Sequence, residues 1–141
     1  MSLVYWDTML FIYWLETHPQ HGKQVERIHQ RMAERGDQLC TSVFTLGEIL
    51  TGFYKAGRTN EVRRVRTYFE TGDVRLLPFN TEAADRYARI RAQYKVSPAD
   101  AIHLASASVA RVDLYLTNDV DLKKLLIEGI HFIAGLDGGI F

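Results

Sequence analysis

The sequence predicts an α/β protein with three layers, in which helices cover both faces of a five-stranded parallel sheet. Five short apolar segments of strand length alternate with longer segments whose apolar residues recur at helical spacing. Strands that alternate with helices favour a parallel sheet, because each crossover helix packs back onto a sheet face. No repeat, low-complexity tract or linker divides the chain, so residues 1–141 are expected to form a single domain.

Two helices are expected between the first two strands. Thr8 is positioned to cap the first helix, which ends near Pro19 because the residue before a proline disfavours helical backbone. Gly36 closes the second helix, in which apolar residues such as Val25 and Ile28 share one face. The expected elements are strand Leu3–Trp6, helix Met9–Leu15, helix Lys23–Arg35 and strand Gln38–Ser42.

The middle of the chain is expected to hold three helices and one strand. Thr45 is positioned to cap the first of these helices, and Gly57 interrupts it. Thr59 is expected to cap the second helix, and Gly72 lies in the turn before the strand. The expected elements are a helix carrying Leu46–Phe53, helix Asn60–Glu70, strand Val74–Leu77 and helix Thr81–Tyr94.

The last part of the chain contains a helix rich in small residues, which can approach the sheet closely. Ser97 and Pro98 provide an N-cap and a first-turn proline for this helix. The segment Gly135–Gly139 is expected to be a loose tail. The expected elements are helix Ala99–Ala110, strand Leu114–Thr117, short helix Val120–Leu126 and strand His131–Ala134.

The composition limits the classes of function. Hydrophobic residues make up 47% of the chain, which is enough for a buried core. Seventeen Lys and Arg balance seventeen Asp and Glu, so only local patches can favour nucleic-acid binding. No apolar run approaches the roughly 18 residues of a membrane span, and no signal peptide is recognisable. The single cysteine, Cys40, excludes an internal disulfide and is expected to be a buried strand residue, so a cytoplasmic setting is expected.

Four acidic residues occupy positions that a parallel sheet would bring together. Asp7 and Asp119 follow apolar strands, while Glu48 and Asp100 lie near the start of helical segments. In open α/β sheets the carboxyl ends of the strands and the starts of the next helices share one edge, and ligands bind there. Four carboxylates on one edge repel each other, and a divalent cation offsets that repulsion. Oxygen-only ligands indicate Mg²⁺ or Mn²⁺.

Each acid also has a structural interpretation. Asp7 and Asp119 could cap the helices that follow them, Asp100 could stabilise a helix dipole, and Glu48 could be an exposed helix residue. For any single acid this interpretation has at least even weight. The coincidence of all four at one predicted edge favours a shared site, in which cations polarise a phosphoryl oxygen and activate a water. No G-x-S-x-G, H-E-x-x-H, P-loop or G-x-G-x-x-G motif is present.

Four segments resemble the PIN-domain nucleases, and in particular the VapC-type toxins of prokaryotic toxin–antitoxin modules. The last two segments are the most specific, and the resemblance covers nearly the whole chain. The segments are Val4-Tyr5-Trp6-Asp7-Thr8, Leu46-Gly47-Glu48-Ile49-Leu50, Asp100-Ala101-Ile102-His103-Leu104-Ala105-Ser106-Ala107 and Leu116-Thr117-Asn118-Asp119-Val120-Asp121-Leu122.

The resemblance implies an endoribonuclease that depends on Mg²⁺ or Mn²⁺ and has a five-stranded parallel sheet. It places the metal ligands and catalytic acids at Asp7, Glu48, Asp100 and Asp119, with Asp121 as a further ligand in some members. Thr8 and Thr117 match polar positions that support the site. His103 is expected to be a hydrogen-bonded core residue and is left out of the metal site.

The resemblance also implies partners: an RNA substrate, a second copy in a homodimer, and a cognate antitoxin lying across the active-site groove. The apolar helix residues Ile49, Leu50, Phe53 and Tyr54 are expected to contribute a dimer contact. Five basic residues are expected to contact RNA phosphates or acidic antitoxin groups, although an ordinary solvated helix face is an equally good interpretation. These residues are Lys55, Arg58, Arg63, Arg64 and Arg66.

Two other functions remain open from the sequence. A metal-dependent phosphatase also clusters acids at strand ends, but aspartyl-phosphate phosphatases show D-x-D at the first strand, whereas this chain has Asp7-Thr8-Met9. A non-catalytic PIN-fold binding or scaffold module would have no use for four repelling carboxylates. A metal titration distinguishes the scaffold from the enzymes.

Overall fold

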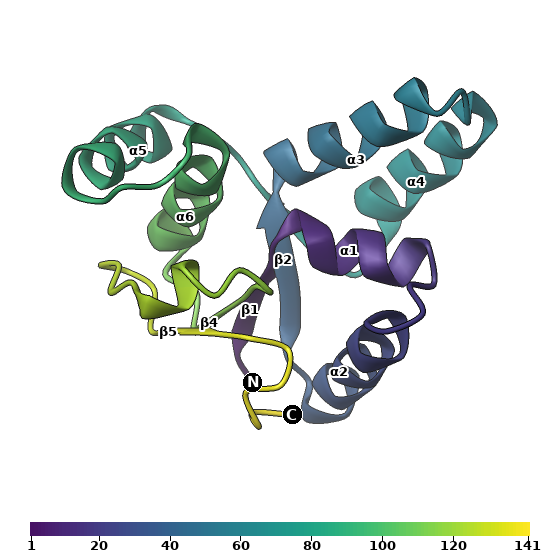
Figure 1. The fold of residues 1–141 in the computed structure, drawn as a ribbon, viewed down its shortest axis with the longest axis horizontal. Helices are drawn as coiled ribbons and strands as arrows, with labels where there is room; N and C mark the ends of the chain where they lie inside the picture. The colour runs from purple at the N-terminus through teal and green to yellow at the C-terminus, as the bar shows by residue number, and fades with distance from the viewer.

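Five parallel strands form one sheet in the computed structural model, which describes all 141 residues (Figure 1). The strand order is β3-β2-β1-β4-β5, and every neighbouring pair is parallel. The predicted parallel sheet is therefore confirmed, with each strand boundary within one residue of its predicted position. The strands are β1 Leu3–Trp6, β2 Gln38–Ser42, β3 Val74–Leu77, β4 Leu114–Leu116 and β5 Phe132–Ala134.

Helices cover both faces of the sheet and bury two separate apolar cores (Figure 1). One face carries α1 Thr8–Leu15, α2 Gly22–Arg35, α3 Val43–Lys55 and α4 Thr59–Thr71. The other face carries α5 Thr81–Gln93 and α6 Pro98–Ala110. The expected helix Val120–Leu126 is wrong, because only a 3₁₀ turn, η1, forms at Leu122–Lys124. The Asp119 carboxylate accepts from the Asp121 N–H at 2.9 Å, which stabilises a local turn in place of a helix.

Two predicted helix caps are wrong by a few residues, and the difference affects the site. Thr8 does not cap α1; Asp7 does, as its structural interpretation anticipated, because its Oδ1 accepts from the N–H groups of Met9 at 3.1 Å and Leu10 at 3.4 Å. Ser42, not Thr45, caps α3. In both places the chain passes from a strand directly into a helix, so the last strand-like residue takes the capping role. The hydroxyl groups of both threonines are thereby free for interior contacts.

Of the caps predicted for the later helices, one is confirmed and one is wrong. The predicted Ser97 cap of α6 is confirmed, since its Oγ accepts from the Asp100 N–H at 3.1 Å. Thr59 does not cap α4, whose N-cap residue is Arg58 and makes no side-chain cap. Asn80 caps α5 through its side-chain oxygen.

Alternation along the strands sends one set of side chains to each face. Tyr5 of β1 and Tyr115 of β4 lie opposite each other in register and stack with ring centroids 4.8 Å apart on the α5/α6 face. Cys40 of β2 lies beside them, and burial raises the pKa of its thiol to about 12, so the predicted buried, unreactive cysteine fits this position. Their neighbours Val4 and Trp6 point into the other core.

The order of strands creates a switch point between β1 and β4, at which connections leave in opposite directions. The carboxyl ends of these strands lie at the edge where α3 and α6 begin (Figure 1). The N- and C-termini lie near each other at the opposite edge (Figure 1). None of the helices combines the length and the apolar character needed to cross a bilayer.

Candidate functional site

Asp7 leaves the end of β1 and is held by three donors. One carboxylate oxygen caps α1, and the other accepts from the Thr117 hydroxyl at 2.5 Å. Burial raises the pKa of the Asp7 carboxyl, and the hydrogen bond from Thr117 and the neighbouring His103 only partly oppose this effect. A carboxylate kept in an unfavourable environment at a ligand-binding edge is typical of a functional residue.

Glu48 reaches the same edge from α3. Its Oε1 accepts from His103 Nε2 at 2.8 Å and from the Thr8 hydroxyl. Burial alone would raise the pKa of this carboxyl, but the hydrogen bonds from His103 and Thr8 outweigh burial, so the pKa is lowered. Glu48 is therefore ionised at neutral pH, and its second oxygen, Oε2, has no partner within the protein.

Asp100 lies in the first turn of α6, on the opposite face of the sheet from α3. Ser97 binds its backbone N–H, while its half-buried carboxylate accepts no hydrogen bond from the protein. The helix N-terminus stabilises the negative charge there. Asp100 thus presents a carboxylate that is available to a ligand.

The buried hydroxyl of Tyr115 lies among these three carboxylates. It has no hydrogen-bond partner. Burial raises the pKa of Tyr115 well above its ordinary value, and the neighbouring acidic groups, which include Asp7, Asp100 and Glu48, raise it further. Asp7, Glu48 and Asp100 therefore all lie near enough to Tyr115 to act on its hydroxyl, at the switch point of the sheet.

Asp119 lies at the same edge but is oriented differently. Its backbone N–H donates to Thr117 Oγ1 at 3.0 Å, so Thr117 connects it to Asp7. Its exposed carboxylate is bound to the N–H of Asp121 in the turn after β4. The exposed Asp121 contributes only that N–H, and no contact brings its carboxylate to the other acids. Asp119 is adjacent to the group of three, and Asp121 is one turn further away.

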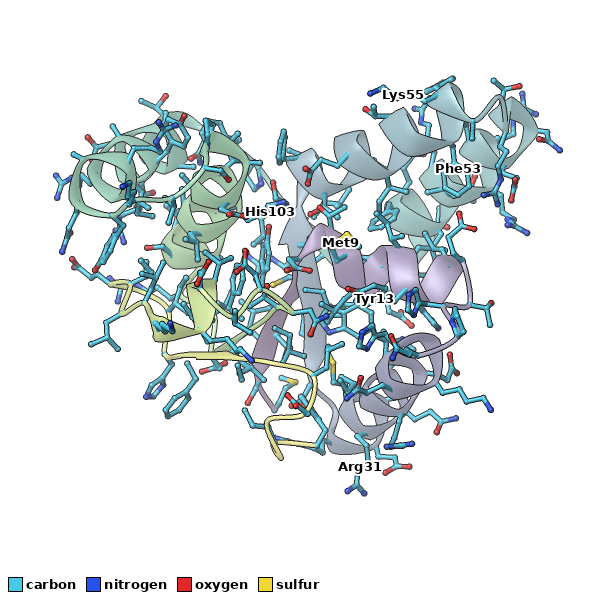
Figure 2. The ribbon with its side chains drawn as sticks, in the orientation of Figure 1. Met9, Tyr13, Arg31, Phe53, Lys55 and His103 are labelled. Atoms are coloured by element: carbon cyan, nitrogen blue, oxygen red, sulfur yellow. The ribbon has the colours of Figure 1, made fainter.

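His103 has a larger place in the site than the sequence suggested. Only 4% of it is exposed, and its ring contacts Tyr5, Thr8 and Glu48. In Figure 2 His103 lies on the side of α6 that faces the central strands. The expectation of a hydrogen-bonded core residue fits this position, but the bond to Glu48 was missed. Its spacing of three residues from Asp100 on one helix was the available signal.

The donor set fits a divalent cation of the Mg²⁺ type. No three acidic, histidine or cysteine side chains enclose an ion as they stand. Mg²⁺ does not require such a cage, since it keeps several waters and binds through one or two carboxylates plus substrate phosphates. Glu48 Oε2 and the Asp100 carboxylate accept no hydrogen bond from the protein, and both are available to a cation. This oxygen-only set suits Mg²⁺ or Mn²⁺ better than softer metals.

Three of the five basic residues expected to bind RNA form ion pairs with acids of α4 or of the segment after α1. Arg58 contacts Glu16 at 2.8 Å and forms a two-bond pair with Glu61. Arg64 and Arg66 lie within 3.4 and 3.2 Å of Glu61 and Glu70. For these three arginines the structure therefore favours an ordinary solvated helix face over a phosphate-binding surface.

Two of the basic residues remain unpaired. Lys55 and Arg63 are exposed and form no ion pair. Figure 2 places Lys55 toward the end of α3 that projects away from the sheet. Lys55 of α3 and Arg63 of α4 are therefore the remaining candidates for contacts with RNA phosphates.

Of the four apolar α3 residues expected to contribute a dimer contact, two are buried, Leu50 is half-buried and Tyr54 is exposed. Ile49 and Phe53 are 3% and 6% exposed and belong to the core, whereas Tyr54 is 57% exposed. A pocket of about 230 Å³ lies between α1 and α3 and extends from Glu48 to Arg58. Its apolar wall comes from Ile12, Leu15, Ile49 and Phe53.

A family comparison assigns the fold. The family model described as "PIN domain" matches residues 4–126. The chain belongs to the PIN domain family. The predicted resemblance is thereby confirmed, although no curated protein sequence matches the chain.

Solved structures share the fold of this PIN domain. One is VapBC2 from Rickettsia felis bound to a DNA fragment from its promoter, with a TM-score of 0.76, 14% identity, and coverage of 94% of this chain and 98% of that chain. Another is a toxin–antitoxin complex from Klebsiella pneumoniae, with a TM-score of 0.69, 22% identity, and coverage of 90% and 94%. A third is VapC20 from Mycobacterium tuberculosis, a toxin that cleaves the sarcin–ricin loop, with a TM-score of 0.66, 12% identity, and coverage of 87% and 96%. At these identities the likeness is one of fold.

Proposed function

We propose that this PIN domain is an endoribonuclease that depends on Mg²⁺ or Mn²⁺ and acts as the toxin of a type II toxin–antitoxin pair. The observation that carries the proposal is the grouping of Asp7, Glu48 and Asp100 around the buried Tyr115 hydroxyl. Three carboxylates at a switch point offer oxygen ligands but no side-chain nucleophile, which suits hydrolysis of a phosphodiester.

The residues of the chain have distinct roles in this proposal. Asp7 and Asp100 hold the cation, Glu48 completes the ligand set, and Asp119 joins it from the end of β4. A bound cation supplies polarisation of the phosphodiester and activation of the attacking water. Thr117 orients Asp7 through the 2.5 Å hydrogen bond, and Thr8 does the same for Glu48. No residue of the chain needs to form a covalent intermediate.

The antitoxin part of the proposal is supported by structural neighbours that are toxin–antitoxin complexes. We infer that an antitoxin segment occupies the pocket between α1 and α3. This pocket offers apolar wall residues for hydrophobic side chains and Glu48 for a basic one. An occupant there would cover the Glu48 carboxylate directly, so inhibition needs no second regulatory site. RNA is the proposed substrate, and the VapC20 neighbour, which cleaves an RNA loop, supports a looped target.

The test is cleavage of a labelled RNA hairpin by the purified protein. We expect cleavage with Mg²⁺ or Mn²⁺, none after EDTA, and recovery when the cation is restored. Asp100→Asn is the most informative variant, because the Asp100 carboxylate has no partner whose loss would disturb the fold. Asp73→Asn, an exposed acid before β3 at the opposite edge, is the matched control.

Three results would contradict the proposal. A protein that binds Mn²⁺ but cuts no RNA while hydrolysing a phosphate monoester is a phosphatase. A folded protein that binds no cation is a scaffold module. Equal cleavage by Asp100→Asn and Asp73→Asn would remove Asp100 from the site.

A further inference from the structure

His103 joins the two sides of the sheet edge through a short chain of hydrogen bonds. Its Nδ1 lies 2.7 Å from the Tyr5 hydroxyl, and its Nε2 lies 2.8 Å from Glu48 Oε1 and 3.2 Å from Thr8 Oγ1. Tyr5 belongs to β1, Glu48 to α3 and His103 to α6. The ring is almost fully buried, so its position is determined by these partners.

The chemistry of Glu48 fixes the direction of the bond with His103. An ionised carboxylate only accepts hydrogen bonds, so His103 Nε2 must carry a proton and donate to Glu48. A neutral ring with a proton on Nε2 has a lone pair on Nδ1, and the Tyr5 hydroxyl is placed to donate to it. A tyrosine hydroxyl carries its proton at neutral pH, so Tyr5 is able to donate.

Glu48 depends on this bond for its orientation. Its side chain is 32% exposed and has several rotatable bonds, so an unrestrained carboxylate would sample the pocket between α1 and α3. His103 and Thr8 both bind Oε1, so Oε2 stays free of protein partners. Outer hydrogen bonds of this kind orient carboxylate ligands and change metal affinity by about 10- to 100-fold.

We propose that His103 is a positioning residue that fixes the Glu48 carboxylate for cation binding, with Tyr5 holding the required tautomer. The proposal rests on the proposed function, in which Glu48 is a cation ligand. Because His103 follows Asp100 on the same face of α6, one helix supplies a ligand and also orients a second ligand from the opposite side of the sheet. His103 itself does not contact the cation or the RNA.

The test measures Mn²⁺ affinity without RNA, by calorimetry or by the electron paramagnetic resonance signal of free Mn²⁺. His103→Gln keeps an amide N–H near the position of Nε2, whereas His103→Asn is too short to reach Glu48 but keeps a polar group near Nδ1. We expect His103→Asn to weaken Mn²⁺ binding by about 10- to 100-fold and His103→Gln to restore most of it. Tyr5→Phe, which removes the shorter of the two contacts to Nδ1 and leaves Thr45 at 3.5 Å, is expected to have a smaller effect.

A double-mutant cycle separates positioning from a general structural role. If His103 acts through Glu48, then His103→Asn should weaken Mn²⁺ binding no further when Glu48 is already Gln. Ser106→Ala is the control, because Ser106 is another buried polar residue of α6 but has no hydrogen-bond partner and contacts no acid. Thermal unfolding in EDTA establishes that each variant is folded.

The outcomes distinguish this proposal from the proposed function. If His103→Asn folds and binds Mn²⁺ with the parental affinity, the positioning role is overturned, while the proposed nuclease function still stands. Additive losses of Mn²⁺ affinity in the double-mutant cycle also overturn the positioning role, since they show that His103 affects binding independently of Glu48. If His103→Asn does not fold, His103→Gln carries the test, and a folded His103→Gln that binds Mn²⁺ about 10- to 100-fold more weakly than the parent contradicts the proposal. A parent protein that binds no Mn²⁺ overturns the proposed function and the positioning role together.

Discussion

Substitution of Asp7 separates three contributions that one carboxylate makes. Asp7 caps α1, accepts a hydrogen bond from Thr117 and carries a charge that burial disfavours. In the proposed function it is also a cation ligand. Asp7→Asn keeps an oxygen for the cap but removes the charge, whereas Asp7→Ala removes all of these features.

The stability of the metal-free variants follows from these contacts. Loss of an N-cap costs about 0.5–2 kcal/mol, and loss of the hydrogen bond with Thr117 adds about 1 kcal/mol. Removal of the buried charge offsets part of this cost. We therefore expect Asp7→Ala to be destabilised by about 1–2 kcal/mol, while Asp7→Asn at neutral pH is at least as stable as the parent.

The sign of the pH dependence follows from the raised pKa of Asp7. Below the unfolded pKa of about 3.9, Asp7 is protonated in both states and no charge is buried. As the pH rises through the folded pKa, the unfolded state releases this proton more readily, so the parent loses stability. Relative to the parent, Asp7→Asn should therefore gain stability between acidic and neutral pH.

Activity should fall in both variants, including Asp7→Asn, whose stability is expected to be maintained or to rise. Loss of one ligand charge is expected to lower kcat by at least about 100-fold, which corresponds to about 2.7 kcal/mol of transition-state stabilisation. Urea unfolding in EDTA across the pH range measures stability, and RNA cleavage with Mg²⁺ measures activity. The reasoning fails if Asp7→Asn cleaves RNA at the parental rate. It also fails if metal-free Asp7→Asn is clearly less stable than the parent at neutral pH.

Four further predictions concern other parts of the molecule and its partners. Ser97→Ala removes the cap of α6 and should lower stability by about 1 kcal/mol in urea unfolding; an unchanged midpoint would contradict the cap. Arg63→Ala should raise KM for RNA and reduce its salt dependence, whereas the paired Arg66→Ala should do neither, and equal effects would remove the distinction. Light scattering at micromolar concentration should detect a homodimer weakened by Tyr54→Asp, and a monomeric parent would refute it. Co-expression with the neighbouring gene should yield a stable complex, and a neighbour that neither binds nor relieves growth arrest would remove the toxin assignment.

The strands and their order along the chain were predictable because the sheet is buried on both faces. Segments such as Leu3–Trp6 and Leu114–Leu116 are continuous apolar runs, and the helices between them show periodic apolar faces. The same logic located Asp7, Glu48 and Asp100, because a parallel sheet places strand ends and helix starts on one edge. Three acids of the candidate site thus follow from connectivity alone.

The buried polar side chains next to these acids form a polar layer that was not predictable in the same way; they are Thr8, Thr45, His103 and the Tyr115 hydroxyl. Thr8 and Thr45 are good caps by sequence, yet the direct strand-to-helix connections give the caps to Asp7 and Ser42 and turn both threonine hydroxyls inward. Tyr115 reads as an ordinary strand aromatic, and only the packed sheet places its hydroxyl among the carboxylates. Sequence periodicity assigns a face, but contacts between distant elements depend on the tertiary fold.

This polar layer determines how the acids lie relative to one another. Glu48 and Asp100 come from helices on opposite faces of the sheet, so apolar packing on either face alone leaves their relative position open. The bonds from His103 to Glu48 and Tyr5 join α6 to α3 and to β1 at that edge. Thr45 adds a contact with Thr41 of β2 at 2.7 Å. A buried network with satisfied members specifies one arrangement more strictly than apolar contacts do, and here it lies directly beneath the carboxylates whose spacing a cation would require.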